Sequence, residues 1–294
     1  MNREALLADA LAGPLGRHPG KLRFEPAGSG GCINQTARVE AAGRRLFVKW
    51  NDRPLAGQFE AEALGLTALR DARTSLVIPE PICWNDAGPG RSFLALEYLE
   101  SGPRAADFDE RLGRGLAALH AVTCEQGFGF QRDGYCGATS QPNAWHADWV
   151  EFYREHRLSH QLRLARENGL PPADCARLTR LLDRLPELLD GGEPPALIHG
   201  DLWSGNLLAS ATGGPALIDP AAHFAHREAE FGLAALFGGV SLRAQSAYEE
   251  VSPLPPGFQE RLGLYSLYHL LNHFNLFGGG YGAKAMQIAG RYVD

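Results

Sequence analysis

Three polar residues in the second half of the chain have the types and spacing that phosphoryl transfer requires. Asp201 and Asn206 stand in IHGDLWSGNLL in the pattern D-x-x-x-x-N, and Asp219 follows in ALIDPA. A short apolar run precedes each polar stretch, which predicts buried strands that deliver these groups to one cleft. Taken singly, such residues are often turn residues or helix caps. Together they match a site where one carboxylate accepts a hydroxyl proton while an amide and a second carboxylate hold Mg²⁺ on ATP.

A rare lysine near the end of a predicted strand is a candidate phosphate contact, and an ordinary surface lysine is the alternative. The chain has three lysines, Lys21, Lys49 and Lys284, among 28 basic residues, so arginine serves at nearly all other positions. Lys49 lies in RRLFVKW (44–50), where a lysine could contact the α- and β-phosphates of ATP. Lysine is a compact point charge and arginine a planar fork, so the two are not equivalent at a phosphate.

A glutamate on the next predicted helix, 53–72, could hold this lysine. At about 100° per residue, Glu62 lies within the apolar face and Glu60 lies well outside it. That face consists of Phe59, Ala63, Leu66 and Leu69. A carboxylate within an apolar face needs a partner. We therefore pair Glu62 with Lys49; a partly exposed glutamate at the edge of the face is the alternative.

Two further segments could contact the nucleotide. The glycine-rich turn GSGGC (28–32) contains Gly30 and Gly31, and its backbone could approach phosphates closely. It matches neither G-x-G-x-x-G nor a Walker motif, and a simple hairpin is the alternative. The strand SFLALEYLE ends near a predicted hinge, where the backbone of Glu97 and Leu99 could pair with adenine.

The surrounding pattern predicts an α+β, two-lobed, protein-kinase-like fold. Residues 1–100 form a small antiparallel β-rich nucleotide-binding lobe, with Ala42-Gly43 as a hairpin turn. Residues 101–294 form a larger, mainly helical catalytic and substrate lobe with a short β insert. The predicted helices outside the first lobe include 108–122, 144–169, 173–190 and 257–278.

Composition narrows the partners and the compartment. The chain has 294 residues, a formal net charge of −6 and no basic run, which argues against nucleic acid or anionic membranes as partners. No stretch approaches 18 consecutive apolar residues, and Glu4 and Asp9 interrupt any signal core, so we expect a cytoplasmic protein.

The histidines and cysteines predict neither a zinc site nor a disulfide framework. The pair His269 and His273 lacks the glutamate of H-E-x-x-H, and both are expected to be core or surface residues. The five cysteines are scattered without a C-x-x-C pair. Cys32, in the glycine loop, could be an exposed thiol or an inert small residue.

The stretch HGDLWSGN (199–206) with IDPA (218–221) resembles the kinase-like enzymes that phosphorylate small molecules, and its tryptophan is similar to that of the fructosamine kinase, or ketosamine-3-kinase, family. Other stretches resemble the same family and span nearly the whole chain. They are GGCINQT, FVKWN, FEAEALGL, DWVEFYREHRLSHQLRLA, HREAEFGLAALFGG and LYSLYHLLNHFNLFGG.

The resemblance implies an ATP- and Mg²⁺-dependent kinase that phosphorylates the 3-hydroxyl of ketoamines and so releases the glycated amine. It makes Asp201 the base, Asn206 and Asp219 the Mg²⁺ ligands, and Lys49 with Glu62 the phosphate-positioning pair. Gly30 and Gly31 then belong to the phosphate loop. Trp203 would lie against the sugar amine, with packing inside the loop as the alternative. Because related loops carry a cysteine at the position of Cys32, the protein could be a monomer or a weak redox-linked dimer.

Some residues depart from the family pattern, and other functions stay open. Phe224-Ala225 replaces an aromatic-glycine pair and Phe231 a smaller aliphatic residue, which affects the substrate rim. The alternatives are a kinase of an aminoglycoside, choline or homoserine, and a non-catalytic nucleotide-binding regulator. The preferred sugar and the choice between free and protein-bound amines are not determined.

Overall fold

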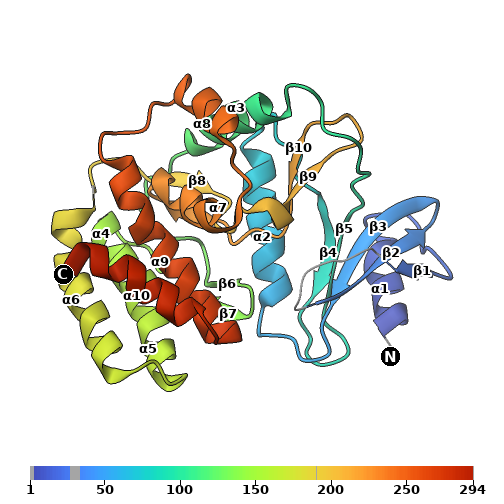
Figure 1. Cartoon of the computed structure of the whole chain (residues 1–294). Helices are drawn as coiled ribbons and strands as arrows, with labels where there is room; N and C mark the ends of the chain where they lie inside the picture. The colour runs from blue at the N-terminus through green and yellow to red at the C-terminus, as the bar shows by residue number, and fades with distance from the viewer. Residues whose placement is uncertain (1–2, 27–33, 190, 294) are drawn as a thin grey trace.

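The structure, a computed structural model, describes residues 3–26, 34–189 and 191–293. Five antiparallel strands form one sheet in the order β1-β2-β3-β5-β4, and the rest of the chain is mainly helical (Figure 1). These strands are β1 (Arg23–Pro26), β2 (Gln35–Ala41), β3 (Arg44–Trp50), β4 (Pro81–Asn85) and β5 (Phe93–Glu97). The predicted α+β class with a small β lobe and a larger helical lobe is confirmed.

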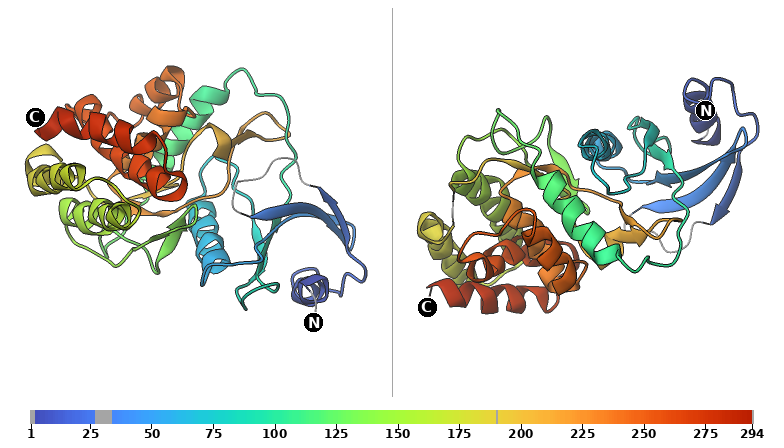
Figure 2. Two further views of the ribbon diagram at one scale, coloured as in Figure 1. Left: turned by 60° about the horizontal axis from the view of Figure 1, so that its bottom comes forward. Right: turned by 90° about the horizontal axis from the view of Figure 1, so that it is seen from above.

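Helix α2 (Gln58–Asp71) lies between the sheet and the helical part in all three views (Figure 1; Figure 2). The other helices are α1 (Arg3–Ala12), α3 (Phe108–His120), α4 (Trp149–Phe152), α5 (His160–Glu167), α6 (Pro172–Leu188), α7 (Phe231–Phe237), α8 (Leu242–Glu249), α9 (Phe258–Phe277) and α10 (Tyr281–Val293). Short strands insert among them as β6 (Gly134–Cys136), β7 (Thr139–Gln141), β8 (Ala196–Ile198), β9 (Leu207–Ala209), β10 (Pro215–Leu217) and β11 (His223–Ala225). None of the helices in the described ranges is long and apolar enough to cross a membrane.

The predicted hairpin joins β2 and β3. Ala42 and Gly43 both have positive φ, 52° and 83°, which is the signature of a type I′ turn. The strands pair from Gln35 with Trp50 to Ala41 with Arg44. This register places Lys49 opposite Thr36 on one side and opposite Leu94 of β5 on the other, so the lysine lies on a central strand of the sheet.

Side-chain caps set where two helices begin, and both predicted starts were too early. Helix α2 begins at Gln58 rather than residue 53, because the Asp86 carboxylate accepts hydrogen bonds from the amides of Phe59 and Glu60. The helix predicted from residue 144 begins at Trp149. There the Asp148 side chain accepts from the Glu151 amide at 2.8 Å.

Other elements were not predicted. Helix α1 packs Leu7 and Leu11 into a core with Val39 and Leu46 of the sheet. The hairpin β6–β7 has strands of three residues, too short for an alternation pattern to develop. A π-helical segment, Tyr153–Ser159, joins α4 to α5 inside the stretch that was predicted as one helix.

The two lobes share part of their core. Phe59 and Leu66 of α2 belong to the same buried cluster as Leu112 and Leu116 of α3 and Tyr248 of α8. The chain leaves the sheet at the end of β5, and α3 begins the helical part. The boundary at residues 100–101 stays a prediction, because the packing is continuous across it.

Candidate active site

Strands β8 and β10 are fully buried and lead into the two polar stretches. Strand β8 pairs with β11 and β10 with β9, so two short hairpins hold the loops that follow. The Ile218 amide donates to the Asn206 carbonyl at 3.1 Å, which ties the second loop to the first. The buried strands therefore bring Asp201, Asn206 and Asp219 to one place.

The side-chain amide of Asn206 joins the two aspartates. Its Nδ2 donates to the Asp201 carbonyl and to Asp201 Oδ2, both at 2.9 Å, and lies 3.5 Å from the Asp219 carbonyl. Because this nitrogen faces Asp201, the side-chain oxygen Oδ1 of Asn206 points away from Asp201. Asn206 is buried, so these contacts hold its orientation firmly.

Asp219 has a strained backbone. Its φ is 55°, in the left-handed region that few residues other than glycine adopt. It is not the helix cap that was the alternative interpretation, because it lies in the loop two residues after strand β10 and bonds to a lysine of the other lobe. Strain of this kind persists where the surrounding structure requires a specific side-chain direction.

Lys49 is bound by two carboxylates. Its Nζ lies 2.7 Å from Glu62 Oε1 and also contacts Asp219 Oδ1, and the lysine is 3% exposed. Burial by itself disfavours the ammonium, but the charges of Asp219 and Glu62 outweigh it and raise the pKa of Lys49. Burial raises the pKa of Glu62, and the lysine opposes that shift. A fixed positive charge thus lies at the junction of β3, α2 and the loop after β10.

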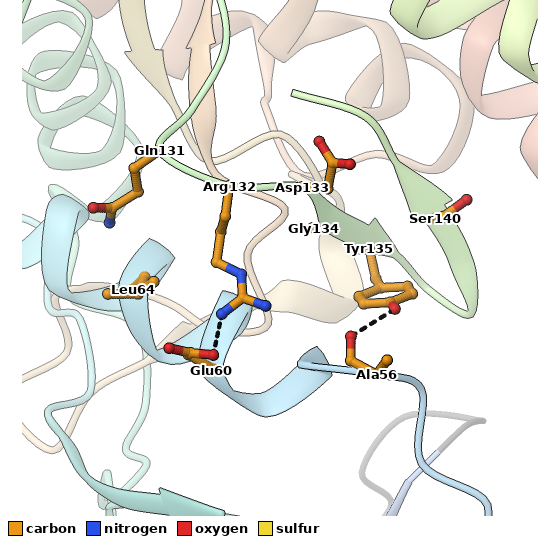
Figure 3. A pocket seen from close by; sticks show the side chains of 9 residues that line it. All are labelled: Ala56, Glu60, Leu64, Gln131, Arg132, Asp133, Gly134, Tyr135 and Ser140. Atoms are coloured by element: carbon orange, nitrogen blue, oxygen red, sulfur yellow. Dashed lines mark hydrogen bonds and ion pairs between the residues drawn. The ribbon is translucent and has the colours of Figure 1, made fainter. Parts of the chain in front are cut away.

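Glu60 has a different environment. It pairs with Arg132 and lines a cavity of about 590 Å³ between α2 and the segment 131–140 (Figure 3). Tyr135 donates to the Ala56 carbonyl at 2.8 Å across the same cavity. Of the two glutamates compared in the sequence, the structure places Glu62 against Lys49; the catalytic role of that pair stays a prediction.

Asp201 has the electrostatic environment of a proton acceptor. Burial, followed by the nearby charge of Asp219, raises the pKa of Asp201 to about 7, although Asn206 opposes the shift. A carboxyl group is most useful as a general base when its pKa lies near the working pH. The other oxygen, Oδ1, accepts from the Cys136 thiol at 3.8 Å.

A buried glutamate that the sequence analysis missed holds the loop before Asp201. Glu230 accepts hydrogen bonds from the amides of His199 at 2.5 Å and Gly200 at 3.0 Å, and it faces His120 at 3.6 Å. The His199 ring in turn contacts the Ile218 carbonyl at 2.9 Å. The available signal was an acidic residue directly before the apolar run FGLAALF.

Glu230→Gln is expected to lower the free energy of unfolding by about 2 kcal/mol, because the new amide turns an N–H towards one of two backbone donors. Burial favours protonation, but His120, His199 and the amide bonds lower the pKa of Glu230 below its usual value of 4.5. A depressed folded pKa contributes stability above the unfolded pKa, and that stability is lost as the pH falls through the folded pKa.

Chemical denaturation of the wild type and Glu230→Gln from pH 7 down to pH 3 measures this contribution. The gap between the two proteins should be widest at neutral pH and should narrow in acid. Glu187→Gln, at an exposed site on α6, is the matched control and should differ little from the wild type at any pH. A gap independent of pH would contradict a role for the Glu230 charge.

Trp203 stands two residues after Asp201 in the sequence and is 37% exposed. Its ring meets Phe237 edge-on, with centroids 6.3 Å apart, and lies over Gly205, where an added Cβ would come within 2.3 Å of the ring. Ser204 donates to the Phe237 carbonyl at 2.9 Å and fixes the same turn. The ring is therefore held in place with one part open, as a substrate contact requires; this role stays a prediction.

The remaining predicted nucleotide contacts are less defined. The Glu97 amide donates to the Glu80 carbonyl at 2.8 Å, so adenine could use only the Glu97 carbonyl and not this amide. Leu99 is half-buried just beyond β5. Gly30 and Gly31, like Cys32, lie outside the described residues.

The donor atoms present fit a hard divalent cation. The side-chain oxygen Oδ1 of Asn206 and the Asp219 carboxylate are both oxygen ligands, which Mg²⁺ prefers. Two protein ligands suit a cation that keeps water and phosphate oxygens as its other ligands. The orientation of the Asn206 amide leaves its oxygen on the side away from Asp201. Among the ion pairs of the described residues, none joins Asp201 to a lysine, whereas Asp219 is bonded to Lys49.

Comparison with known proteins places the chain among its relatives. The family model for fructosamine kinase matches residues 20–294. The chain is 42% identical to the chloroplastic protein-ribulosamine 3-kinase of Oryza sativa subsp. japonica over 268 residues, which cover 90% of this chain and 77% of that protein. It is 39% identical to the protein of the same name from Arabidopsis thaliana, with coverage of 90% and 81%.

Solved structures also resemble this chain. A Thermobifida fusca protein assigned to the fructosamine-3-kinases superposes with a TM-score of 0.84 at 38% identity, and the match covers 97% of both chains. Aminoglycoside phosphotransferase APH(4)-Ia superposes with a TM-score of 0.62 at 17% identity and covers 97% of this chain and 98% of its own. The second match shows only the shared fold. From the matched residues and the identities above, this chain belongs to the fructosamine kinase family.

Proposed function

We propose that this chain is an ATP-dependent kinase that phosphorylates the 3-hydroxyl of ketoamines, the adducts that sugars form with amines. The observation that carries the proposal is the meeting of Asp201, Asn206 and Asp219 around one amide, with Lys49 bound to Asp219 from the opposite lobe. The 42% identity to a protein-ribulosamine 3-kinase supports a ketoamine as the acceptor.

Each residue has a defined part in the transfer. Asp201 accepts the proton of the sugar hydroxyl as its oxygen bonds to the γ-phosphorus and the bond to ADP breaks. Lys49, held by Glu62 and Asp219, presents a fixed charge to the α- and β-phosphates. Asn206 and Asp219 would hold Mg²⁺, which supplies charge neutralisation on the phosphate oxygens when bound. The product is unstable and releases the free amine, so the reaction amounts to deglycation.

Trp203 is the proposed contact for the other end of the substrate. The amine of a ketoamine is secondary and cationic at neutral pH, and an indole face attracts such a charge. Trp203 stands two residues after Asp201 in the sequence and is 37% exposed, which supports a contact with the part of the substrate that extends outward. We also assign the adenine contact to the Glu97 carbonyl and the Leu99 backbone, where the chain leaves β5.

Turnover of ribulosyl-lysine and fructosyl-lysine with ATP and Mg²⁺ tests the function directly. Phosphate transfer to at least one ketoamine, followed by release of lysine, is the expected result. The same assay should include an aminoglycoside, choline and homoserine as competing acceptors. Transfer to one of these in preference to both ketoamines would overturn the proposed acceptor, and no transfer to any acceptor would favour a nucleotide-binding regulator.

A further inference from the structure

A layer of buried polar side chains lies against the catalytic aspartate. Asp201 Oδ2 is bonded to Asn206, and its other oxygen accepts from the thiol of Cys136, on β6. Asn272, on α9, donates to Cys136 Sγ at 3.3 Å and to the Cys136 carbonyl at 3.2 Å. These hydrogen bonds fix the hairpin β6–β7 to α9 beside Asp201.

The layer continues outward through side-chain amides. Gln161 of α5 donates to Asn272 Oδ1 at 3.4 Å, and Asn275 donates to Gln161 Oε1 at 2.7 Å. Gln161 and Asn272 are almost fully buried, at 0% and 2% exposed. Because nearly every group in this chain of contacts is paired, it holds Cys136 rigidly, as connected buried networks do.

Within this layer, His269 has a ring nitrogen without a hydrogen-bond partner. One of its ring nitrogens, the Cys136 sulfur and an Asp201 oxygen lie within 4.8 Å of one another. The histidine is 4% exposed, and its Nδ1 is buried without a hydrogen-bond partner. A buried polar atom without a partner is destabilising, so an unpaired nitrogen on a ring that lies beside Asp201 indicates a ligand that completes it.

The chemistry of the layer favours a hydrogen-bonding role over a metal site. Burial, then the neighbouring His273 and Arg157, lower the pKa of His269 to about 3, so the imidazole is neutral and offers one N–H and one lone pair. Burial and the Asp201 charge raise the pKa of Cys136 well above its usual value, so the thiol keeps its proton. A metal ion would have to displace that proton and would occupy the base.

We propose that His269 binds the C2 oxygen of the ketoamine and so determines specificity for this substrate class. The inference rests on the proposed function, because the 3-hydroxyl must lie at Asp201 for its proton to be accepted. The C2 oxygen is carried by the neighbouring carbon, and a group within 4.8 Å of the base can contact it. His269 is thus a specificity-determining residue, and Cys136, which is bonded to Asn272, lies beside it.

The test pairs a substitution with a change in the substrate. His269→Leu and His269→Asn are compared with the wild type on fructosyl-lysine or ribulosyl-lysine, and on a 2-deoxy analogue in which C2 is a methylene. His269→Leu should lower kcat/KM for the ketoamine about tenfold, because one neutral hydrogen bond is lost. It should leave kcat/KM for the analogue unchanged. His269→Asn, which keeps a donor, should recover part of the discrimination. KM for ATP should not move.

The control and the possible outcomes separate the inference from the function. His160→Leu removes an imidazole on α5 that contacts Ser140 outside this layer and should keep full discrimination. Equal losses on both substrates in His269→Leu, or a raised KM for ATP, would indicate a structural role and overturn the inference while wild-type turnover still supports the function. If the wild type phosphorylates neither ketoamine, the function fails and the inference fails with it.

Discussion

Asp201→Asn is expected to lower kcat by about 1,000-fold, with the affinity for ATP nearly unchanged. The substitution removes the proton acceptor and its charge but keeps the size of the side chain. Asn206 can still donate to the oxygen of the new amide, so the loop keeps its main contact. Lys49, Glu62 and Asp219, the groups assigned to the nucleotide, are not altered. The loss should therefore fall on the transfer step.

The measurement combines steady-state turnover of a ketoamine with direct titration of the nucleotide. Asp183→Asn, on the exposed side of α6, is the matched control and should retain wild-type kcat. Loose phosphoryl transfer depends on positioning as well as on a base, so some residual activity is compatible with the assignment. A variant that keeps more than about a tenth of the wild-type kcat would contradict Asp201 as the base.

The local patterns in the sequence were sufficient to predict the elements that carry the charged groups. Two apolar runs before HGD and DPA predicted the buried strands β8 and β10, because burial on both faces leaves a short continuous apolar stretch. Helical periodicity separated Glu62 from Glu60, and the structure places only Glu62 against Lys49. Both inferences depend on neighbours within one element.

Contacts between distant elements could not be predicted in the same way. Glu230 binds the amides of His199 and Gly200, some 30 residues earlier, and no periodicity relates a carboxylate to backbone donors. His269 was expected to be an ordinary core or surface histidine. Its place beside Asp201 depends on how α9 packs against the β6–β7 hairpin, and that hairpin was itself too short to recognise.

Lys49→Arg is expected to lower kcat/KM for ATP by about 100-fold, although the positive charge is retained. The ammonium of Lys49 contacts Glu62 and Asp219 at once in a site that is 3% exposed. The planar, longer guanidinium cannot occupy that space without moving one carboxylate. Asp219 would move more readily than Glu62, because its side chain is 32% exposed and that of Glu62 12%, and it is also a proposed Mg²⁺ ligand.

Because arginine keeps both carboxylates neutralised, this variant should fold, and the loss should appear in nucleotide use. Lys49→Met leaves Glu62 and Asp219 without a partner and should be clearly less stable as well as inactive. Lys21→Arg and Lys284→Arg, both at exposed positions, are the controls and should behave as the wild type. Turnover against ATP concentration, with a thermal melt for each protein, separates the two effects. If Lys49→Arg used ATP as efficiently as the wild type does, any positive charge would suffice at this position. The prediction of a specific role for lysine would then be wrong.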